Sequence, residues 1–277
     1  MSLPLSFKAL ANFLALIHIQ KLGINMLTRR QSLIWLPAMG LVGCGATKME
    51  NVDIKGVASA AKDVGTAMNL TDDQVRGYAS QMAKQMDSQA SIAPAGNNYA
   101  KRLVALTSGA QEDKGMRLNY KVYITKEVNA FAMADGTIRI YSGLMDMLTD
   151  DEIRYVVGHE IGHVAAGHTK KRYQTALATS AAQKSAASSG NAAAATLATS
   201  ELGDLIVKVV KAQHSQGNEN EADDYAMDFM SRRKYDRKAV VTALDKLDKL
   251  SGGKDSSWLS THPAPKERAA RMRTKLA

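Results

Sequence analysis

Apolar and polar positions recur along this chain with two different periods, which predict where helices and strands form. The run Thr71-Asp72-Asp73-Gln74 has the capping-box pattern that begins a helix, and a second helix is predicted at 97–107. After it, β-branched and aromatic residues occur in short runs that are typical of strands. Strands are predicted at 119–125, 129–133 and 137–141. Ala134-Asp135-Gly136 suits a turn between the last two, so we expect a small antiparallel sheet.

A second capping box, Thr149-Asp150-Asp151-Glu152, predicts the start of another helix, and its acidic residues suit the positive end of the helix dipole. Further along, Ala222, Ala226, Phe229 and Met230 have helical spacing. Aromatic residues make up only 5% of the chain, whereas Ala, Leu and Met are abundant, which favours helices over a β-sandwich. The predicted fold class is helix-rich α+β.

The composition narrows the class of protein. A chain of 277 residues that is 45% hydrophobic and 23% charged is ordinary globular material, and collagen-like, disordered and disulfide-scaffold proteins are excluded. Cys44 is the single cysteine, so an intramolecular disulfide and a cysteine metal cluster are excluded as well. The net charge is +9, but the residues before Cys44 contribute +4 of it, and the remaining basic residues are scattered among acids. This pattern argues against nucleic-acid binding.

The segment before Cys44 has the pattern of an export signal. Arg29 and Arg30 precede an apolar stretch at 33–42, which is too short to span a bilayer. Leu41-Val42-Gly43-Cys44 resembles the bacterial lipobox, in which the cysteine thiol receives a diacylglycerol. We therefore predict that Cys44 is lipidated and anchors the protein to a membrane. The alternatives are a buried cysteine at the end of an apolar helix and, for the export route, a twin-arginine signal.

The chain divides into three predicted parts. Residues 1–43 form the targeting region, in which translation is expected to start at Met26, and residues 44–70 form a lipidated tether of small residues. Residues 71–277 form the folded domain. Ala, Ser and Thr dominate 174–200, which we interpret as a low-complexity insertion, either a disordered surface excursion or a lid.

His159 and His163 are four residues apart in the helix that begins near Thr149, in the pattern His159-Glu160-Ile161-Gly162-His163. On a helix, this spacing puts both imidazoles on one face, where two nitrogens can bind one zinc ion. Glu160 lies beside that face, where its carboxylate can take a proton from metal-activated water. The pattern indicates the active-site helix of a zinc peptidase.

A catalytic zinc takes three protein ligands and keeps one position open, so a third ligand must come from elsewhere in the chain. Glu219 and Asp223 are four residues apart on one predicted helical face, and Glu221 lies off it. We predict that Glu219 is the third ligand and that Asp223 accepts the N–H of a ligand histidine. The alternative for this acidic run is a solvated surface.

His168 does not fit the metzincin pattern, which needs a glycine three and a histidine six residues beyond His163. Gly167 suits the left-handed position at a helix end, so His168 is expected to follow that end and not to bind metal. His214 has no predicted role.

These residues resemble the HtpX and CAAX prenyl protease family of gluzincins, and the chain is most like the periplasmic lipoprotein branch of that family. The resemblance covers Thr71 to Arg273. It is carried by Asn129-Ala130-Phe131-Ala132, Tyr141-Ser142-Gly143-Leu144, the helix with His159 and His163, Glu219-x-x-Ala222-Asp223 and His262-Pro263. The family implies a gluzincin-type domain, one zinc per chain and endoproteolysis in envelope quality control.

The resemblance also implies roles for three further parts of the chain. The strand at 129–132 is expected to be an edge strand that pairs with extended substrate. His262 is expected near the zinc, either in its open position as a restraint or as a donor to the oxyanion, and the alternative is a cap on the next helix. Arg268 either contacts substrate or braces the fold.

The predicted function is zinc-dependent hydrolysis of internal peptide bonds, with Glu160 as general base and misfolded proteins as substrates. The expected location is the periplasm, with a lipid anchor in the outer membrane, beside other assembly or quality-control factors. A lipid-anchored chaperone with a structural zinc site is the alternative. An aminopeptidase is disfavoured because no second acidic motif near the active helix can capture a substrate amine.

Overall fold

The computed structural model describes residues 69–188, 208–250 and 257–277. The helices are α3 (Asp72–Gln89), α4 (Asn98–Leu106), α5 (Ser142–Met147), α6 (Asp150–Ala165), α7 (His168–Ser188), α10 (Gln216–Arg232), α11 (Lys238–Asp248), α12 (Ser257–Thr261) and α13 (Pro265–Leu276). The strands are β1 (Glu112–Asp113), β2 (Met116–Arg117), β3 (Asn119–Tyr123), β4 (Ala130–Ala132) and β5 (Thr137–Tyr141). The targeting region, Cys44 and the predicted tether as far as residue 68 lie outside the described residues.

The helix-rich α+β class predicted from the sequence is confirmed. The three helices whose starts were predicted, α3, α4 and α6, begin within one residue of the predicted positions. The Thr71 hydroxyl accepts the N–H of Gln74, whose side chain accepts the N–H of Thr71, so the first capping box closes in both directions. The Glu152 carboxylate likewise accepts the N–H of Thr149, 2.8 Å away, at the start of α6. Gly167 follows the end of α6 with a φ of 72°, which suits glycine. Residues 174–188 of the predicted insertion continue α7, and 189–200 lie outside the described residues.

The main sheet has the strand order β3-β5-β4. β4 and β5 form the predicted antiparallel hairpin, with Phe131 opposite Arg139. The pairing of β3 differs from the antiparallel prediction, because β3 runs parallel to β5, with Val122 opposite Ile140. The stretch between β3 and β4 carries the chain past β5, so that β5 is the central strand. The outer edge of β3 is bridged by Ile92, which leaves the outer edge of β4 without a strand neighbour among the described residues.

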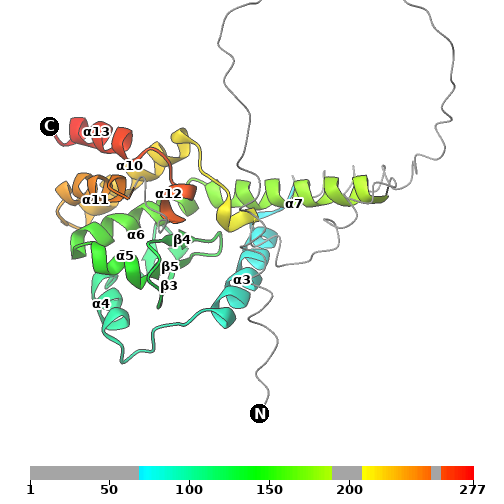
Figure 1. Ribbon diagram of the computed structural model, residues 1–277, viewed down its shortest axis with the longest axis horizontal. Coiled ribbons are helices and arrows are strands. Elements are labelled where there is room, and N and C mark those ends of the chain that lie inside the picture. Colours follow the sequence, from blue (N-terminus) through cyan, green and yellow to red (C-terminus); the bar gives the residue numbers. More distant parts are fainter. Residues whose placement is uncertain (1–68, 189–207, 251–256) are drawn as a thin grey trace, which may run out of the picture. The chain divides into compact units, whose positions relative to one another are not determined.

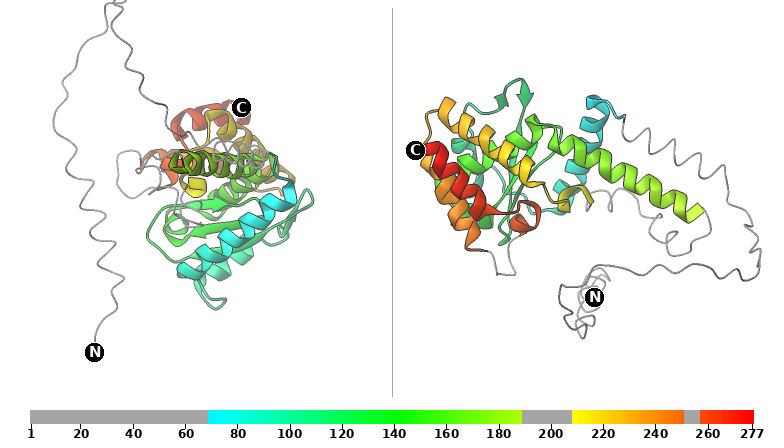
Figure 2. Two further views of the ribbon diagram at one scale, coloured as in Figure 1. Left: turned by 90° about the vertical axis from the view of Figure 1, so that its right-hand side faces the viewer. Right: turned by 90° about the horizontal axis from the view of Figure 1, so that it is seen from above.

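Helix α6 lies between the sheet and the C-terminal helices (Figure 1). It packs against β4 and β5 on one side and against α10 and α11 on the other, while α13 covers α10 and α11. The left view of Figure 2 shows the strands on one side of this arrangement and the helices of the C-terminal region on the other. The most buried helix of the described chain therefore carries the histidine motif.

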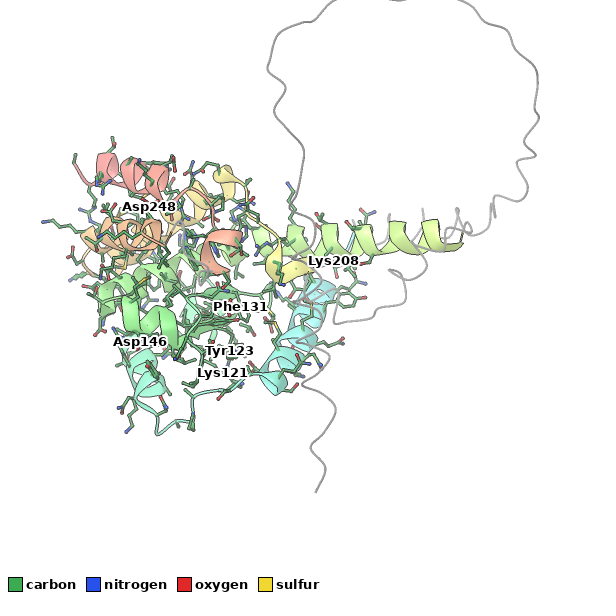
Figure 3. The ribbon with its side chains drawn as sticks, viewed as in Figure 1. Lys121, Tyr123, Phe131, Asp146, Lys208 and Asp248 are labelled. Atoms are coloured by element: carbon green, nitrogen blue, oxygen red, sulfur yellow. The ribbon has the colours of Figure 1, made fainter. Side chains whose placement is uncertain are left out.

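The core has two apolar clusters. The larger one joins the sheet, α6, α10, α11 and α13 around fully buried side chains such as Ile138, Ile153 and Phe229. The smaller one joins α3, the sheet and α7, and it includes Tyr123 and Phe131, whose ring centroids are 6.0 Å apart (Figure 3). Among the described helices, none is long and apolar enough to cross a membrane.

Candidate metal centre

Two glycines of α6 let α10 approach the histidine motif closely. A methyl group on Gly158 would lie 2.9 Å from Cδ1 of Phe229, and one on Gly162 would lie 3.0 Å from the Cα of Ala222. The two glycines are one helical turn apart on the face of α6 that meets α10. Because neither has a side chain, they set the distance between the two helices. The close approach brings the histidines of α6 against the acidic residues of α10.

Three side chains converge between α6 and α10. The Nε2 atoms of His159 and His163 are 3.0 Å apart, and the Glu219 carboxylate lies 3.6 Å from the first and 3.3 Å from the second. All three side chains are at most 1% exposed. Ligand atoms about 2.0–2.1 Å from a tetrahedral zinc are themselves about 3.3 Å apart, so these separations suit one ion between them.

The charge distribution at this cluster also suits a cation. Neither oxygen of Glu219 accepts a well-formed hydrogen bond from the described residues, although one of them forms an ion pair with Arg268. Burial lowers the pKa of His163 to about 3, which leaves its imidazole neutral. Burial and Arg268 lower the pKa of His159, but Asp223 and Glu219 outweigh them and raise it to about 9. A positive charge is therefore favoured between these groups, and a metal ion would compete with that proton.

Asp223 lies behind the cluster and orients His159. Its carboxylate is 2.9 Å from Nδ1 of His159 and accepts the hydroxyl of Tyr155 at 2.8 Å. Arg268, from α13, donates to both oxygens of Asp223 at 2.8 and 2.7 Å, and it is completely buried. Burial raises the pKa of Asp223, but Arg268 and His159 outweigh it and hold that pKa well below the usual range. The carboxylate is thus charged and accepts the Nδ1–H of His159, so Nε2 of that ring faces the cluster.

Glu160 and His262 lie close to each other at this cluster. Nε2 of His262 is 3.5 Å from Oε1 of Glu160, and it belongs to the same group of donor atoms as the two histidines and Glu219, all within 4.8 Å of one another. The His262 ring stacks on Trp258 at 3.8 Å, and its Nδ1 faces the carbonyl of Trp258. Burial raises the pKa of the Glu160 carboxyl to about 7. The side chain of His262 does not cap α13, which begins after Ala264 without a side-chain cap.

The strand predicted to bind substrate borders this site. Ala130 and Phe131 are buried, and Ala132 is half-buried beside the Glu160 carboxylate. The N–H of Ala130 is taken by the side-chain oxygen of Asn129, 2.9 Å away. The residues before and after Ala130 bond to β5, so Ala130 and Ala132 direct their backbone groups away from the sheet.

A second motif of this region, Tyr141-Ser142-Gly143-Leu144, has a structural role. The hydroxyl of Ser142 donates to the carbonyl of Thr125 at 2.8 Å and accepts the N–H of Thr125 at 2.9 Å. A methyl group on Gly143 would lie 2.4 Å from the carbonyl oxygen of Lys126. The motif therefore holds the loop before β4 against the start of α5.

Arg172 is a charged residue beside β4 that the sequence did not single out. Its Nε and Nη2 atoms are buried and bond to none of the described residues. It lines a small pocket together with Phe131, Ala132 and Met133. Burial lowers the pKa of Arg172 to about 10, while the charges of Glu160 and Glu219 act in the opposite direction, so its guanidinium keeps its positive charge.

Several contacts of the histidine helix were not predicted from the sequence. Tyr155 is one turn before His159 on the same face, so the helical spacing could have identified it. His168 lies against His163 and Glu221, and His214 stacks on the His163 ring at a centroid distance of 3.7 Å. No sequence spacing relates His214 to His163, because the two meet only in the folded chain.

Comparison with known proteins identifies relatives of this chain. The sequence matches Peptidase family M48 over residues 97–276. It is 45% identical over 238 residues to Metalloprotease LoiP of Escherichia coli (strain K12), an alignment that covers 86% of this chain and 92% of that protein. It is 37% identical over the same length to Metalloprotease YcaL of that strain, with the same coverage. It is 26% identical over 198 residues to the Beta-barrel assembly-enhancing protease of Yersinia pestis, which covers 65% of this chain and 38% of that protein.

Proposed function

The chain belongs to peptidase family M48, and from that premise we propose that it is a zinc-dependent endopeptidase of the bacterial envelope that hydrolyses internal bonds of misfolded proteins. It is a metallopeptidase, and its substrates are polypeptides. The observation that carries the proposal is the group of buried donor atoms from His159, His163, Glu219 and His262, which lie within 4.8 Å of one another.

His159, His163 and Glu219 are the proposed zinc ligands. Two imidazole nitrogens and one carboxylate form a common donor set for catalytic zinc, and they favour it over calcium and magnesium, which prefer oxygen ligands. Zinc bound here would supply Lewis acidity and lower the pKa of a water molecule toward neutrality. Asp223 and Arg268 are assigned positioning roles, because Arg268 is buried behind the ligands and holds the Asp223 and Glu219 carboxylates.

Glu160 is the proposed general base. It follows the first histidine ligand directly and is 2% exposed, so its carboxylate is held beside the ligand cluster without being part of it. It would accept a proton from the attacking water and deliver that proton to the leaving amine nitrogen. Nε2 of His262, 3.5 Å from Glu160, can donate to the oxyanion in the neutral tautomer that carries its hydrogen on Nε2, or can fill the fourth ligand position. The presence of this nitrogen among the donor atoms favours the second role, that of a restraint.

The outer edge of β4 is the proposed substrate site. The carbonyl groups of Ala130 and Ala132 point away from β5, so an extended peptide can pair with them beside Glu160. Arg172 offers two buried nitrogens that bond to none of the residues described around it, and a buried guanidinium needs a partner. A carbonyl oxygen of the bound peptide is the partner that we assign to Arg172.

The proposed location is the periplasmic face of the outer membrane, with lipidated Cys44 as the anchor. The lipobox resemblance supports this assignment, and Cys44 itself lies outside the described residues. Labelled palmitate should be incorporated into the native protein and not into Cys44→Ser. Labelling of Cys44→Ser to the normal extent would exclude the anchor.

The decisive experiment is metal analysis combined with digestion of unfolded casein by the purified protein. One zinc per chain, cuts at internal bonds and loss of those cuts with a chelator are expected. Glu160→Gln should keep its zinc and lose cleavage by at least about a hundredfold, a typical contribution of general base catalysis. Glu267→Gln, an exposed acidic residue on α13, is the matched control and should cleave normally. Normal cleavage by Glu160→Gln would remove Glu160 from the mechanism.

The alternative is a lipid-anchored chaperone with a structural zinc site. The name of one relative combines β-barrel assembly with protease activity. For this chain, an assembly or chaperone activity is therefore tested separately from proteolysis. If the protein is a chaperone, native protein and Glu160→Gln should suppress the aggregation of an unfolded client equally well. Loss of cellular function in Glu160→Gln would support the protease instead.

A further inference from the structure

His168 and Glu221 form a hydrogen-bonded chain behind His163. Nδ1 of His163 lies 3.0 Å from Nδ1 of His168, and Nε2 of His168 lies 3.1 Å from Oε2 of Glu221. Both distances are those of ordinary hydrogen bonds. The chain runs from the ligand cluster to the protein surface, because His163 is 1% exposed, whereas the Glu221 side chain is 64% exposed.

The direction of the hydrogen bonds follows from the chemistry of the last group. An ionised carboxylate can only accept, so Nε2 of His168 carries the hydrogen that faces Glu221. In a neutral imidazole the other nitrogen is then an acceptor, so Nδ1 of His168 accepts the Nδ1–H of His163. This arrangement leaves the lone pair of His163 on Nε2, which is the atom 3.0 Å from Nε2 of His159 and 3.3 Å from Glu219.

We propose that His168 and Glu221 are positioning residues that set the tautomer and the ring orientation of His163 for metal binding. The inference rests on the proposed function, because it concerns the same zinc site. The two ligand histidines are then oriented by different means. His159 donates directly to the buried Asp223 carboxylate, whereas His163 donates through a second histidine to a carboxylate at the surface.

The fold explains why this indirect arrangement is needed. Asp223 is one turn from Glu219 on α10 and already accepts from His159, Tyr155 and Arg268. Gly167 turns the chain with a φ of 72° between α6 and α7, and this turn brings His168 back against His163 in the last turn of α6. His214 stacks on the His163 ring, with an interplanar angle of 14°, so the ring is held both at Nδ1 and on one face.

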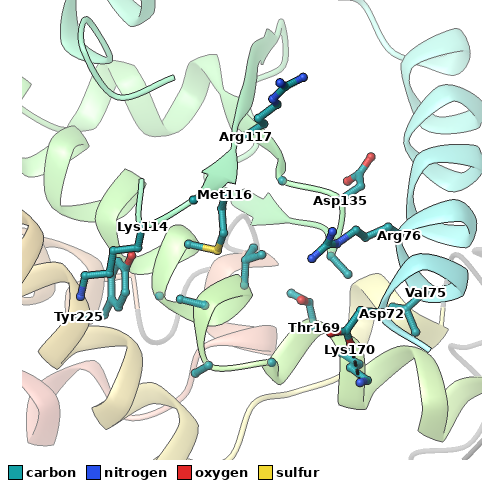
Figure 4. Close-up of a pocket in the computed structure, with 18 of the residues that line it drawn as sticks. Asp72, Val75, Arg76, Lys114, Met116, Arg117, Asp135, Thr169, Lys170 and Tyr225 are labelled. Carbon is teal, nitrogen blue, oxygen red and sulfur yellow. Dashed lines mark hydrogen bonds and ion pairs between the residues drawn. The ribbon is translucent and has the colours of Figure 1, made fainter. Parts of the chain in front are cut away.

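Glu221 is accessible from a large cavity, which lets its contribution be tested separately. The cavity has a volume of about 800 Å³, and Glu221 and Gly162 are among its lining residues. Thr169, Lys170 and Tyr225 line it as well (Figure 4). Water can reach the Glu221 carboxylate there and can replace it as an acceptor for His168. We therefore expect His168 to matter more than Glu221.

The first test measures the tautomers of the native protein by long-range ¹H–¹⁵N correlation of its histidine side chains. His163 should carry its hydrogen on Nδ1 and His168 on Nε2, in the metal-free protein and with zinc bound. A hydrogen on Nε2 of His163 in the metal-free protein, or on Nδ1 of His168, would overturn the proposal. This measurement needs no variant and does not depend on peptidase activity.

The second test measures the zinc dissociation constant by competition with a chelator. Removing a group that orients a ligand histidine typically weakens metal binding by about 10–100-fold, so His168→Leu should show a loss in this range. His168→Asn keeps an oxygen acceptor near the place of Nδ1 and should recover most of the affinity, which a role in packing alone would not explain. Glu221→Ala should lose less than His168→Leu, and Glu267→Ala is the matched control without loss.

The outcomes distinguish failure of the proposed function from failure of the proposed role of His168 and Glu221. If native protein binds zinc but does not cut casein, the proposed function is overturned and the positioning role of His168 and Glu221 still holds. If His168→Leu, His168→Asn and native protein bind zinc with equal affinity, the positioning role is overturned and the proposed peptidase function still holds. If His168→Leu does not fold, the tautomers of the native protein decide the question by themselves.

Discussion

Gly162 lies so close to Ala222 that a methyl group on Gly162 would be 3.0 Å from both the Cα and the carbonyl oxygen of Ala222. These are backbone atoms on the buried face of α10 and cannot move aside at low cost. The contact fixes the separation of α6 and α10, and this separation in turn fixes the distances between His163 and Glu219. A residue without a side chain therefore controls the geometry of the candidate metal centre.

Gly162→Ala should lower the free energy of unfolding by about 1–3 kcal/mol, the usual cost of overpacking a core, and should weaken zinc binding as well. Urea unfolding of the metal-free protein and chelator competition measure the two effects. Gly77→Ala is the matched control, because Gly77 is on α3 with nothing within 4 Å of the added methyl group. The control should be neutral or stabilising by up to about 1 kcal/mol. Native zinc affinity in Gly162→Ala would show that the helix contact does not set the site.

His262→Ala should increase kcat/KM for an unfolded substrate, because Nε2 of His262 is among the donor atoms of the cluster and restrains the open position. Zinc content and unfolding are measured alongside, so that loss of the stacking on Trp258 is not mistaken for a change in catalysis. A fall of a hundredfold or more at unchanged zinc content would instead assign His262 to the oxyanion.

Arg172→Met should raise KM by about tenfold or more at unchanged zinc affinity, since a hydrogen bond from a charged donor contributes about 1.5–3 kcal/mol. Arg76→Met is the matched control, because Arg76 is exposed and its ion pair with Asp73 is 3.9 Å long. Steady-state kinetics on a peptide substrate measure both variants. Equal KM values in Arg172→Met and native protein would rule out contact between Arg172 and the substrate.

Glu152 predicts a pH dependence of stability. Burial raises its pKa, but hydrogen bonds from Lys246, the Thr149 N–H and Thr242 outweigh burial and hold that pKa below its usual value. The carboxylate therefore stabilises the fold fully above the unfolded pKa of about 4.3, and this stabilisation is lost as the pH falls through the lower folded value.

The comparison is between native protein and Glu152→Gln in urea unfolding across pH. Native protein should be more stable by about 1–3 kcal/mol at pH 7, and the difference should shrink toward zero under strongly acidic conditions. Glu267→Gln should show no such trend. A difference that stays constant with pH would mean that the shape of Glu152, not its charge, stabilises the start of α6.

The helices and the hairpin were predictable because their signals are local. Thr71 with Gln74, and Thr149 with Glu152, satisfy the free N–H groups of their own helix ends, so the capping pattern predicts each start within a few residues. Gly136, with a φ of 85°, makes the turn of the β4–β5 hairpin for a similarly local reason. The parallel pairing of β3 was not predictable, since it depends on how the loop before β4 crosses β5.

The amino-acid sequence was sufficient to identify the candidate ligands. His159 and His163 share a face of α6 wherever that helix packs in the fold, and Glu219 and Asp223 share a face of α10 for the same reason. It was not sufficient for the contacts between elements. The stacking of His214 on His163 and the hydrogen bond of His168 to Glu221 join residues whose distance along the sequence carries no periodic signal. Helical spacing is a property of one backbone segment, whereas these contacts arise only when α6, α7 and α10 pack at the distance that Gly158 and Gly162 permit.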